Sequence, residues 1–346
     1  MATTGMVPAD AAPFALRQAP GELAEGAAKL AGEIGSTGVE ALLAQANRTA
    51  VRKGAAAALG AMSPKPHEWY AFDAKDQATV DWYPQGLTGG EDSGEAGVPV
   101  FAVSWYFKPK APVPERGVRV TFLSPSTLKY QHVLLVEAKP DGSYGPIDIH
   151  AGGIAWYGDL LYVADTKRGL RVFDLNTMLD LRTAQKDLGD DKRVGRHGGR
   201  FHAFGYRYVV PQSDFWRLAS PSGAIFSFVA IDRSAGPDLL ITGEYDPDGP
   251  TGRVVRYELA GNRPGPARDC FQMGAAKIQG AVSQGGTWYL SQAFDADRNG
   301  RLLVTNGAKL SARPFPIGPE DLTVQGGRLW SVTEFKNRRV VFGVSL

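Results

Sequence analysis

The chain has 346 residues, with 38 basic and 36 acidic side chains, a net charge of +2 and one cysteine. This near-balance of charge argues against a nucleic-acid-binding protein, which would carry a basic stripe. One cysteine excludes an intramolecular disulfide and a cysteine-based zinc site. The sequence contains no run of about 18 apolar residues, so no membrane span is predicted.

The first 66 residues differ in character from the rest of the chain. Residues 1–20 lack the basic and apolar regions of a signal peptide, although their start resembles sequence that follows a signal-peptidase cut. We therefore expect a secreted protein in its mature form, with a cytoplasmic protein as the alternative. Residues 20–62 are rich in helix formers, and Leu23, Ala27 and Leu30 recur at helical spacing. The composition predicts an N-terminal helical extension over 1–66, with a loosely held leader as the alternative.

From residue 67 to residue 346 the sequence is typical of an all-β domain. Short strand-like runs alternate with Gly, Pro, Asp and Asn clusters, and they recur as a unit. Each unit has a first strand of small residues, a second strand with aromatics and a third with alternating apolar residues. Radial packing of such units is typical of a β-propeller. The units begin near Pro84, His150, Phe226, Ile278 and Glu320.

Five blades are predicted, with six as the alternative if residues 198–220 form a blade of their own. The chain ends on a third strand, "VVFGVSL", so the outer strand of the last blade is missing from the C-terminal side. We expect residues 69–74 or 78–83 to supply it, which would close the ring by joining the two ends of the chain.

Polar residues open the first strands where a purely structural strand would carry Val or Ile. In a propeller these positions converge at the mouth of the central channel, although they lie far apart in sequence. Such a ring is a ligand site or a satisfied internal hydrogen-bond network. The residues are Gln85, His150, Ser227, Gln279, Glu320 and Asp321.

A histidine with two carboxylates is sufficient for acid–base chemistry or for binding a hard cation. We expect His150, Glu320 and Asp321 to be catalytic, with Glu320 also a metal ligand. Gln85, Gln279 and Ser227 would bind substrate. Two further substrate-binding candidates are Trp156, as a stacking platform, and His202, in a glycine-rich segment whose alternative is a solvated loop.

Acidic residues elsewhere in the chain give weaker signals. In "FDADRNG", the residues Asp295, Asp297 and Asn299 alternate before a glycine, as in the first half of a calcium loop. The two interpretations are a bound divalent cation such as Ca²⁺ and a plain hairpin turn. Carboxylates also follow second strands at three similar places, where they are expected to brace a turn. These residues are Asp165, Glu244 and Glu334.

Several phrases resemble a family of uncharacterised, mostly secreted β-propeller proteins of high-GC bacteria. They include "YPQGLT", "SWYF" and "HAGGIAWYGDLLYVADTKRGLRVFDL", and the resemblance runs from about residue 80 to the C-terminus. The phrase "GPEDL" is similar to a motif of gluconolactonase and strictosidine-synthase propellers. That resemblance implies that Glu320 helps to hold a central divalent cation.

Two functions from different classes remain open. The first is an enzyme that acts at the channel mouth on a small polar or glycosidic molecule, as a hydrolase, lactonase, lyase or cyclase/isomerase. The second is a non-catalytic propeller that binds a glycan or a protein. Because the blade entrances differ from one another, a single asymmetric site is favoured over one site per blade. We expect a monomer with a small-molecule or glycan ligand.

Overall fold

The computed structural model describes residues 5–94, 99–110, 112–221, 223–234 and 236–346. It is all-β with a few helices, which confirms the all-β part of the prediction. None of the helices in these ranges is long and apolar enough to cross a bilayer.

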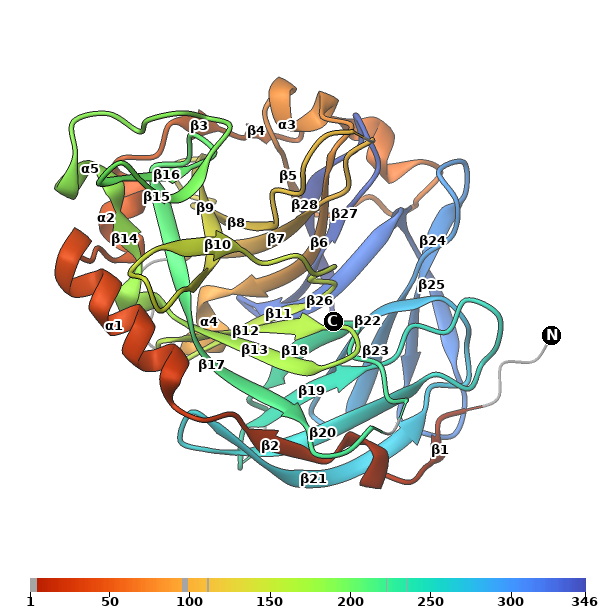
Figure 1. The fold of residues 1–346 in the computed structure, drawn as a ribbon. Helices are drawn as coiled ribbons and strands as arrows, with labels where there is room; N and C mark the ends of the chain where they lie inside the picture. The colour runs from red at the N-terminus through yellow and green to blue at the C-terminus, as the bar shows by residue number, and fades with distance from the viewer. Residues whose placement is uncertain (1–4, 95–98, 111, 222, 235) are drawn as a thin grey trace.

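Five antiparallel units of four strands make up the body of the molecule (Figure 1). The first contains β6 (Trp82–Gly89), β7 (Phe101–Phe107), β8 (Val118–Leu123) and β9 (Lys129–Ala138). The second contains β11 (Ile154–Tyr157), β12 (Leu160–Asp165), β13 (Gly169–Asp174) and β17 (Tyr208–Leu218). The third contains β18 (Phe228–Asp232), β19 (Leu239–Gly243), β20 (Arg253–Ala260) and β21 (Arg263–Gln272). The fourth contains β22 (Ile278–Gln284), β23 (Thr287–Gln292), β24 (Asn299–Thr305) and β25 (Ser311–Ile317). The fifth contains β26 (Pro319–Gln325), β27 (Arg328–Thr333), β28 (Val340–Ser345) and β5 (Glu68–Ala71).

The first strands of the units contact one another in a closed cycle, β6 to β11, β18, β22, β26 and back to β6. This cycle of contacts differs from the arrangement of two stacked sheets. The first and second units are also joined at their outer edges, where β17 pairs in parallel with β9. Residues 198–220 form no separate unit, because they contribute to a small hairpin and to β17.

The two ends of the chain meet in the fifth unit. Strand β5 pairs antiparallel with β28, with Tyr70 opposite Val341. This pairing confirms that the outer strand of the last unit comes from residues N-terminal to the repeats.

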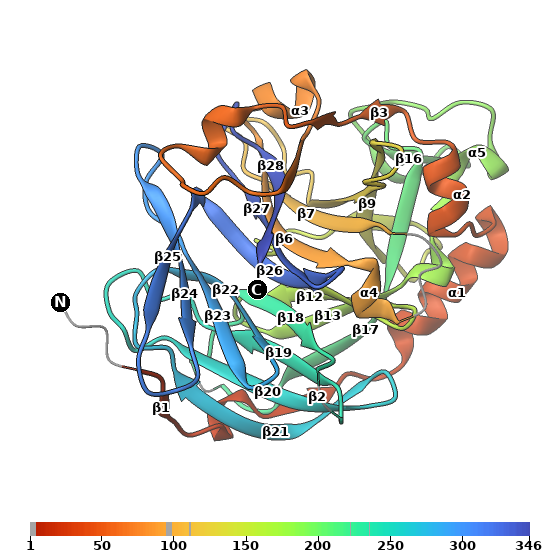
Figure 2. The ribbon, with the colours of Figure 1, turned by 180° about the vertical axis from the view of Figure 1, so that it is seen from behind.

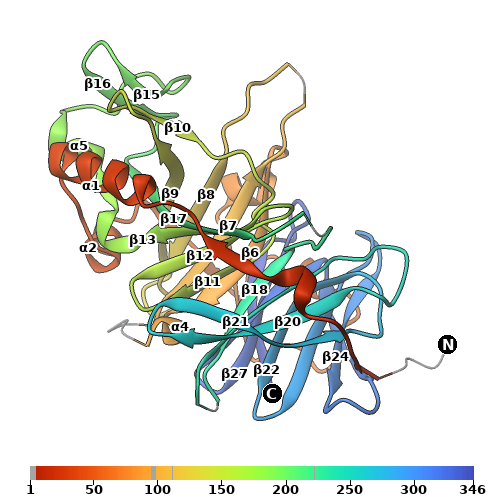
Figure 3. The same cartoon turned by 60° about the horizontal axis from the view of Figure 1, so that its bottom comes forward.

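The N-terminal extension contains the expected helices, α1 (Glu22–Ile34) and α2 (Val39–Ala44), but it also contains strands (Figure 3). Four of its strands, each two or three residues long, pair with the outer strands of four different units. Strand β1 (Val7–Pro8) pairs with β21, and β2 (Leu16–Gln18) pairs with β17. Strand β3 (Arg48–Thr49) pairs with β9, and β4 (Val51–Arg52) pairs with β5. The extension therefore covers sheet edges that would otherwise be open to pairing with another chain.

Short elements complete the fold. Two 3-10 turns, Ala12–Phe14 and Ala56–Leu59, belong to the extension, and a third spans Leu175–Thr177. Short helices α3 (Ala74–Ala78), α4 (Gly90–Ser93) and α5 (Leu181–Ala184) flank the sheets. Small strands β10 (Tyr144–Pro146) and β14 (Leu179–Asp180) pair with β9 and β17. Strands β15 (Val194–His197) and β16 (Arg200–Ala203) form a hairpin beside them. Its second strand, β16, is labelled in Figure 2.

Aromatic side chains of the second strands fill the space between neighbouring sheets, as expected. The Trp330 ring of β27 lies 4.6 Å from Phe101 of the first unit, measured between ring centroids. Trp288 of β23 lies 6.1 Å from Phe271 of the third unit. The Trp105 ring of β7 packs at 4.8 Å against Phe72, which follows β5. These contacts bury large apolar areas at the wide, outer part of the wheel.

Small residues let the inner strands approach closely. A Cβ atom built on Gly153 would lie 2.1 Å from the backbone nitrogen of Val229, and one on Gly280 would lie 2.7 Å from the Asp321 Cα. Neither obstacle is a flexible side chain. The inner wall therefore depends on glycine at these points.

Gly153→Ala is expected to destabilise the protein by at least about 1–3 kcal/mol, the usual range for overpacking a close contact. Gly32→Ala in α1 is the matched control, because a Cβ there meets nothing within 4 Å and alanine favours a helix. Denaturant unfolding of both variants checks this. A Gly153→Ala variant as stable as wild type would contradict it.

Two buried carboxyl groups hold the inner strands together. The Asp321 Oδ2 atom of β26 accepts hydrogen bonds from the backbone nitrogens of Leu87 at 3.2 Å and Ile154 at 3.1 Å. The Asp92 Oδ2 atom of α4 accepts from the hydroxyl groups of Thr88, at 2.9 Å, and Thr323. Each carboxyl thus joins neighbouring units near the axis.

Burial raises the pKa of Asp92 to about 7, although its hydrogen bonds to Thr323 and Thr88 act in the opposite direction. The unfolded chain therefore ionises at this residue before the folded protein does. Stability from this group is present at low pH and is lost as pH rises from about 4 to about 7.

Asp92→Asn removes this titration and keeps an acceptor for the two threonines. Relative to the variant, wild type should lose up to about 1.4 kcal/mol of unfolding free energy per pH unit across that window. Urea unfolding at pH 4, 5.5 and 7 measures the difference. Parallel pH profiles for the two proteins would contradict the assignment.

Candidate functional site

Register shifts in three units occur where the expected site residues lie. The pairing of β6 with β7 shifts between Pro84 and Leu87, which brackets Gln85. The pairing of β22 with β23 shifts between Ile278 and Gly280, which brackets Gln279. The pairing of β26 with β27 shifts between Pro319 and Leu322, which brackets Glu320 and Asp321. A β-bulge re-aims side chains out of the sheet alternation, so the same local device recurs at three entrances of the ring.

A chain of hydrogen bonds links the entrances at Gln85 and His150 with Glu334, which follows β27. The His150 Nε2 atom lies 2.8 Å from the Gln85 Oε1 atom. The Gln85 amide nitrogen donates to the Glu334 Oε2 atom at 3.2 Å and to the Pro84 carbonyl at 2.9 Å. Because both partners of that nitrogen are acceptors, the Gln85 oxygen faces His150, and the imidazole Nε2 must carry a proton. In neutral His150 the Nδ1 atom then keeps its lone pair.

His150 stays neutral at pH 7 in this setting. Its side chain reaches solvent, but its ring also packs against the Tyr106 ring, with centroids 4.2 Å apart. Desolvation, and then the charge of Lys108, lower the pKa of His150 below its ordinary value. The neutral imidazole can accept a proton or a hydrogen bond at Nδ1.

Two carboxyl groups of the fifth unit face this network in different environments. Glu320 is fully buried, and its Oε1 atom accepts a hydrogen bond from the Gln279 amide at 3.4 Å. Burial, and then the charges of Glu334 and Asp321, raise the pKa of Glu320 well above its ordinary value. Burial also raises the pKa of Glu334, but the Gln85 hydrogen bond and the charges of Arg339 and Lys108 oppose that rise. Glu320 is therefore the group that holds its proton, and Glu334 is the group that ionises first.

Two tyrosines complete the mouth. The pKa of Tyr106 is raised by burial and by the charges of Glu334, Tyr83 and Glu320. The pKa of Tyr245 is raised by burial and by the charges of Glu320 and Glu334. The Ser227 hydroxyl oxygen accepts the Tyr245 backbone N–H at 3.0 Å. Ser227 thus positions the start of the Tyr245 segment.

Asp321 does not share this position. Its side chain is fully buried, and Oδ2 accepts from two backbone N–H groups of the inner strands. Its Oδ1 atom has no hydrogen-bond partner in the described part of the chain, while its Oδ2 atom is occupied by the backbone N–H groups of Leu87 and Ile154. The predicted catalytic role of Asp321 does not fit this placement. Its carboxyl group is directed at the backbone of β6 and β11, so it cannot also point to the mouth.

Two other predicted substrate contacts lie elsewhere. Trp156 is buried in the core, where its indole nitrogen donates to the Gly158 carbonyl at 2.7 Å and its ring packs on Phe122. It is therefore a packing residue and not a stacking platform. His202 belongs to the β15–β16 hairpin, and its Nδ1 atom accepts the Asp190 backbone N–H at 2.9 Å. It braces that hairpin and does not reach the mouth.

The calcium-loop prediction meets a competing set of hydrogen bonds. The Asn299 amide nitrogen donates to the carbonyls of Leu59 and Phe315, and its oxygen accepts the Ala61 N–H at 2.8 Å. This side chain fixes the N-terminal extension to β25, while Asp295 and Asp297 form an exposed turn.

In the described ranges, no group of three or more His, Cys, Asp or Glu side chains could hold a metal ion. The residues around Glu320 therefore do not fit the metal role implied by the gluconolactonase-type resemblance.

Glu334 was expected to brace a turn, like Asp165 and Glu244. Those two do so. Asp165 accepts a hydrogen bond from Arg171 Nε at 2.9 Å, and Glu244 accepts two from the Nε–Nη2 edge of the Arg253 guanidinium group. At Glu334 the nearby arginine, Arg339, instead donates Nε to the backbone carbonyl at 2.9 Å. The side chain is left for Gln85. The sequence signal that distinguishes it is the absence of an alternating Arg on the following strand.

No family model matches the chain, and no curated protein matches it. Among solved structures, it is similar to a GH43_1 enzyme from Xanthomonas citri, with a TM-score of 0.37, 10% identity, and coverage of 78% of this chain and 88% of that one. It is also similar to RS223-beta-xylosidase, with a TM-score of 0.36, 9% identity, and coverage of 77% of this chain and 92% of that one. For hydrazine synthase of Kuenenia stuttgartiensis the TM-score is 0.33 and the identity 13%, with coverage of 74% of this chain and 75% of that one. Likenesses at these scores support no inference about activity.

The electrostatics of the mouth predict how His150 titrates. Its pKa should lie below 6.5, and Lys108→Gln should raise it while leaving it below 6.5, because burial is the larger cause. NMR titration of the five histidines, with His150→Asn for assignment, measures both values. A His150 pKa at or above 6.5 in wild type would refute this environment.

Proposed function

We propose that the chain is a five-bladed β-propeller hydrolase whose active site is the mouth formed by Gln85, His150, Gln279, Glu320 and Glu334. The substrate class is a neutral, polyhydroxylated small molecule joined by a glycosidic bond. The observation that carries the proposal is the pair of glutamates whose surroundings separate their protonation states. Such a pair assigns an acid and a base at one pH.

Glu320 is the general acid in this proposal. Its buried carboxyl keeps a proton at neutral pH and can donate it to the leaving oxygen as the C–O bond breaks. Glu334 is the general base, because Gln85, Arg339 and Lys108 favour its carboxylate. It takes the proton of the water that adds to the substrate carbon, so that the overall reaction consumes one water.

The remaining groups suit an uncharged, hydroxyl-rich ligand. The side chains of Gln85, Gln279 and neutral His150 offer both donors and acceptors without a formal charge. Tyr106 adds an aromatic face beside His150, and sugar rings pack well on such amphipathic side chains. His150 also orients Gln85, which in turn holds Glu334.

The test uses purified protein and a panel of p-nitrophenyl glycosides. We expect release of p-nitrophenol from at least one of them, with kcat reduced about 10²- to 10⁴-fold in Glu320→Gln and in Glu334→Gln. Glu258→Gln, an exposed residue of the third unit, is the control and should keep wild-type activity. Activity should fall as pH drops and protonates Glu334, and fall again as pH rises and ionises Glu320.

The alternative of a non-catalytic glycan-binding propeller gives a different result. Saturable binding of a glycan without turnover of any panel member, weakened by Gln279→Ala and Gln85→Ala, would replace the hydrolase proposal. Turnover that is unchanged in both glutamate variants would overturn the assignment of this mouth.

A further inference from the structure

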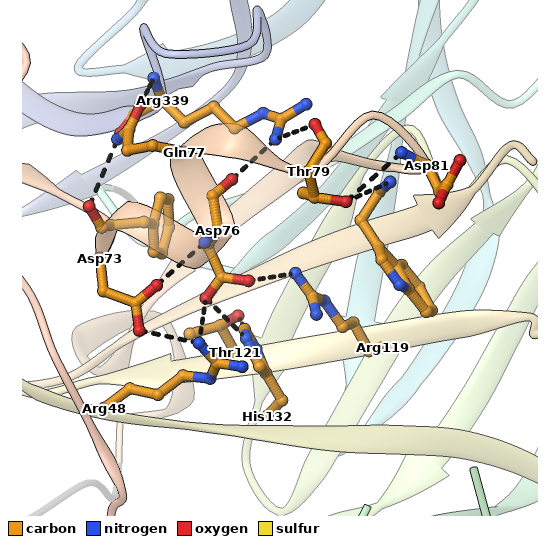
Figure 4. Close-up of polar contacts among 12 residues, drawn as sticks. Arg48, Asp73, Asp76, Gln77, Thr79, Asp81, Arg119, Thr121, His132 and Arg339 are labelled. Carbon is orange, nitrogen blue, oxygen red and sulfur yellow. Dashed lines mark hydrogen bonds and ion pairs between the residues drawn. The ribbon is translucent and has the colours of Figure 1, made fainter. Parts of the chain in front are cut away.

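A second polar pocket lies away from the mouth, between α3, the β3–β9 edge and the segment around the β15–β16 hairpin. Figure 4 shows the polar contacts around Asp76, one of its lining residues. It encloses about 420 Å³, enough for a small metabolite-sized molecule. We call it the α3 pocket. Its charged lining residues are Arg48, Lys75, Asp76, Arg116, Arg119, Asp191 and Arg207.

Asp76 is the buried centre of this cluster and is already neutralised. Its Oδ1 atom binds Arg119 at 2.8 Å, and its Oδ2 atom accepts from the Tyr130 hydroxyl at 2.7 Å. Oδ2 also lies 2.9 Å from His132 Nε2 and 3.3 Å from Arg48. Burial, and then Arg119, lower the pKa of His132 to about 4, so His132 is neutral at pH 7. Asp76 therefore has no capacity left to neutralise other cations of the pocket.

Two further cations are paired outside the pocket. Arg48 binds Asp73 at 2.7 Å. Arg207 donates through Nε to Asp180 at 2.8 Å, in a two-pronged contact. These arginines shape the wall, and their charge is largely balanced by those partners.

Lys75 and Arg116 are different, because neither forms an ion pair with a carboxylate in the described ranges of the chain. The Arg116 guanidinium group is held over the Phe204 ring at 5.3 Å and over Phe107 at 5.9 Å. Stacking fixes its orientation while leaving its edge donors free. Asp191 is the one other acid on the lining, so an excess of positive charge remains.

A buried donor without an acceptor points to the same place. Arg119 is 4% exposed and lies between the Trp82 and Trp105 rings, 4.6 Å from each centroid. Nη2 binds Asp76 and Nη1 reaches the Tyr206 hydroxyl at 3.3 Å, but Nε has no partner in the described part of the chain. A buried guanidinium donor left unsatisfied is destabilising, so this arginine retains an unmet demand for an acceptor.

We propose that the α3 pocket binds a phosphate group, either free phosphate or the monoester of a small molecule. Against the charge of Asp191, Lys75 and Arg116 leave a net positive charge on the lining, which favours an anionic ligand. Phosphate also offers several strong acceptor oxygens to the Lys75 ammonium, the Arg116 edge and the orphaned Arg119 Nε. This site is independent of the hydrolase proposal, because none of its residues lines the mouth.

The test is isothermal titration calorimetry with three probes: inorganic phosphate, glucose 6-phosphate and acetate. Wild type should bind at least one phosphate probe at least about tenfold more tightly than acetate, with affinity falling as NaCl rises. Lys75→Gln and Arg116→Gln should each weaken phosphate binding at least about threefold, and the double variant at least about tenfold. Tighter binding of glucose 6-phosphate assigns the ligand to an ester, and tighter or equal binding of inorganic phosphate assigns it to the free ion.

Lys167→Gln and Arg263→Gln are matched controls, since both residues are exposed and their removal makes the same change in net charge. Arg119 is left intact, because its removal would leave buried Asp76 without its main partner. Three results would overturn the proposal: phosphate binding no tighter than acetate, a Lys75→Gln/Arg116→Gln variant within twofold of wild type, or control variants that weaken binding equally.

Discussion

The structure depends on the close approach of five inner strands around one axis. The strands pack so tightly that a single methyl group on Gly153 or Gly280 would meet backbone atoms. Because the first strands contact one another in a cycle, the polar groups at their entrances lie close together. The crowding that closes the wheel is therefore also what assembles the mouth.

The same crowding explains the chemistry of the buried acids. Asp92 and Asp321 join inner strands and accept hydrogen bonds from neighbouring units, so they act as structural acceptors. One residue before Asp321, a bulge turns Glu320 to the mouth, where burial and the neighbouring Glu334 charge favour its protonated form. Two adjacent carboxyl groups thus lie in different surroundings, within the segment where the register of β26 against β27 shifts.

One buried side chain connects the two sites. Arg339 donates Nε to the Glu334 carbonyl and Nη1 to the carbonyls of Asp76, at 2.7 Å, and Thr79, at 3.0 Å, as Figure 4 shows for the α3 end. It fixes the segment that carries Glu334 against the segment that lines the α3 pocket. Strand β5, which completes the fifth unit from the other end of the chain, lies directly before this junction.

The sequence by itself determined the all-β class, the repeating unit, the exchange of β5 into the last unit and the entrances that hold Gln85, His150, Gln279 and Glu320. These features follow from strand periodicity, turn residues and polar residues at strand starts, all of which are local. Only the tertiary structure decided that Asp321 joins strands, that Trp156 packs in the core and that Glu334 belongs to the mouth. It also decided that Asp76, Arg116 and Arg119, far apart in the chain, share one pocket. Each of these outcomes depends on which neighbour a side chain meets across two sheets, and on bulges that change its direction by one residue.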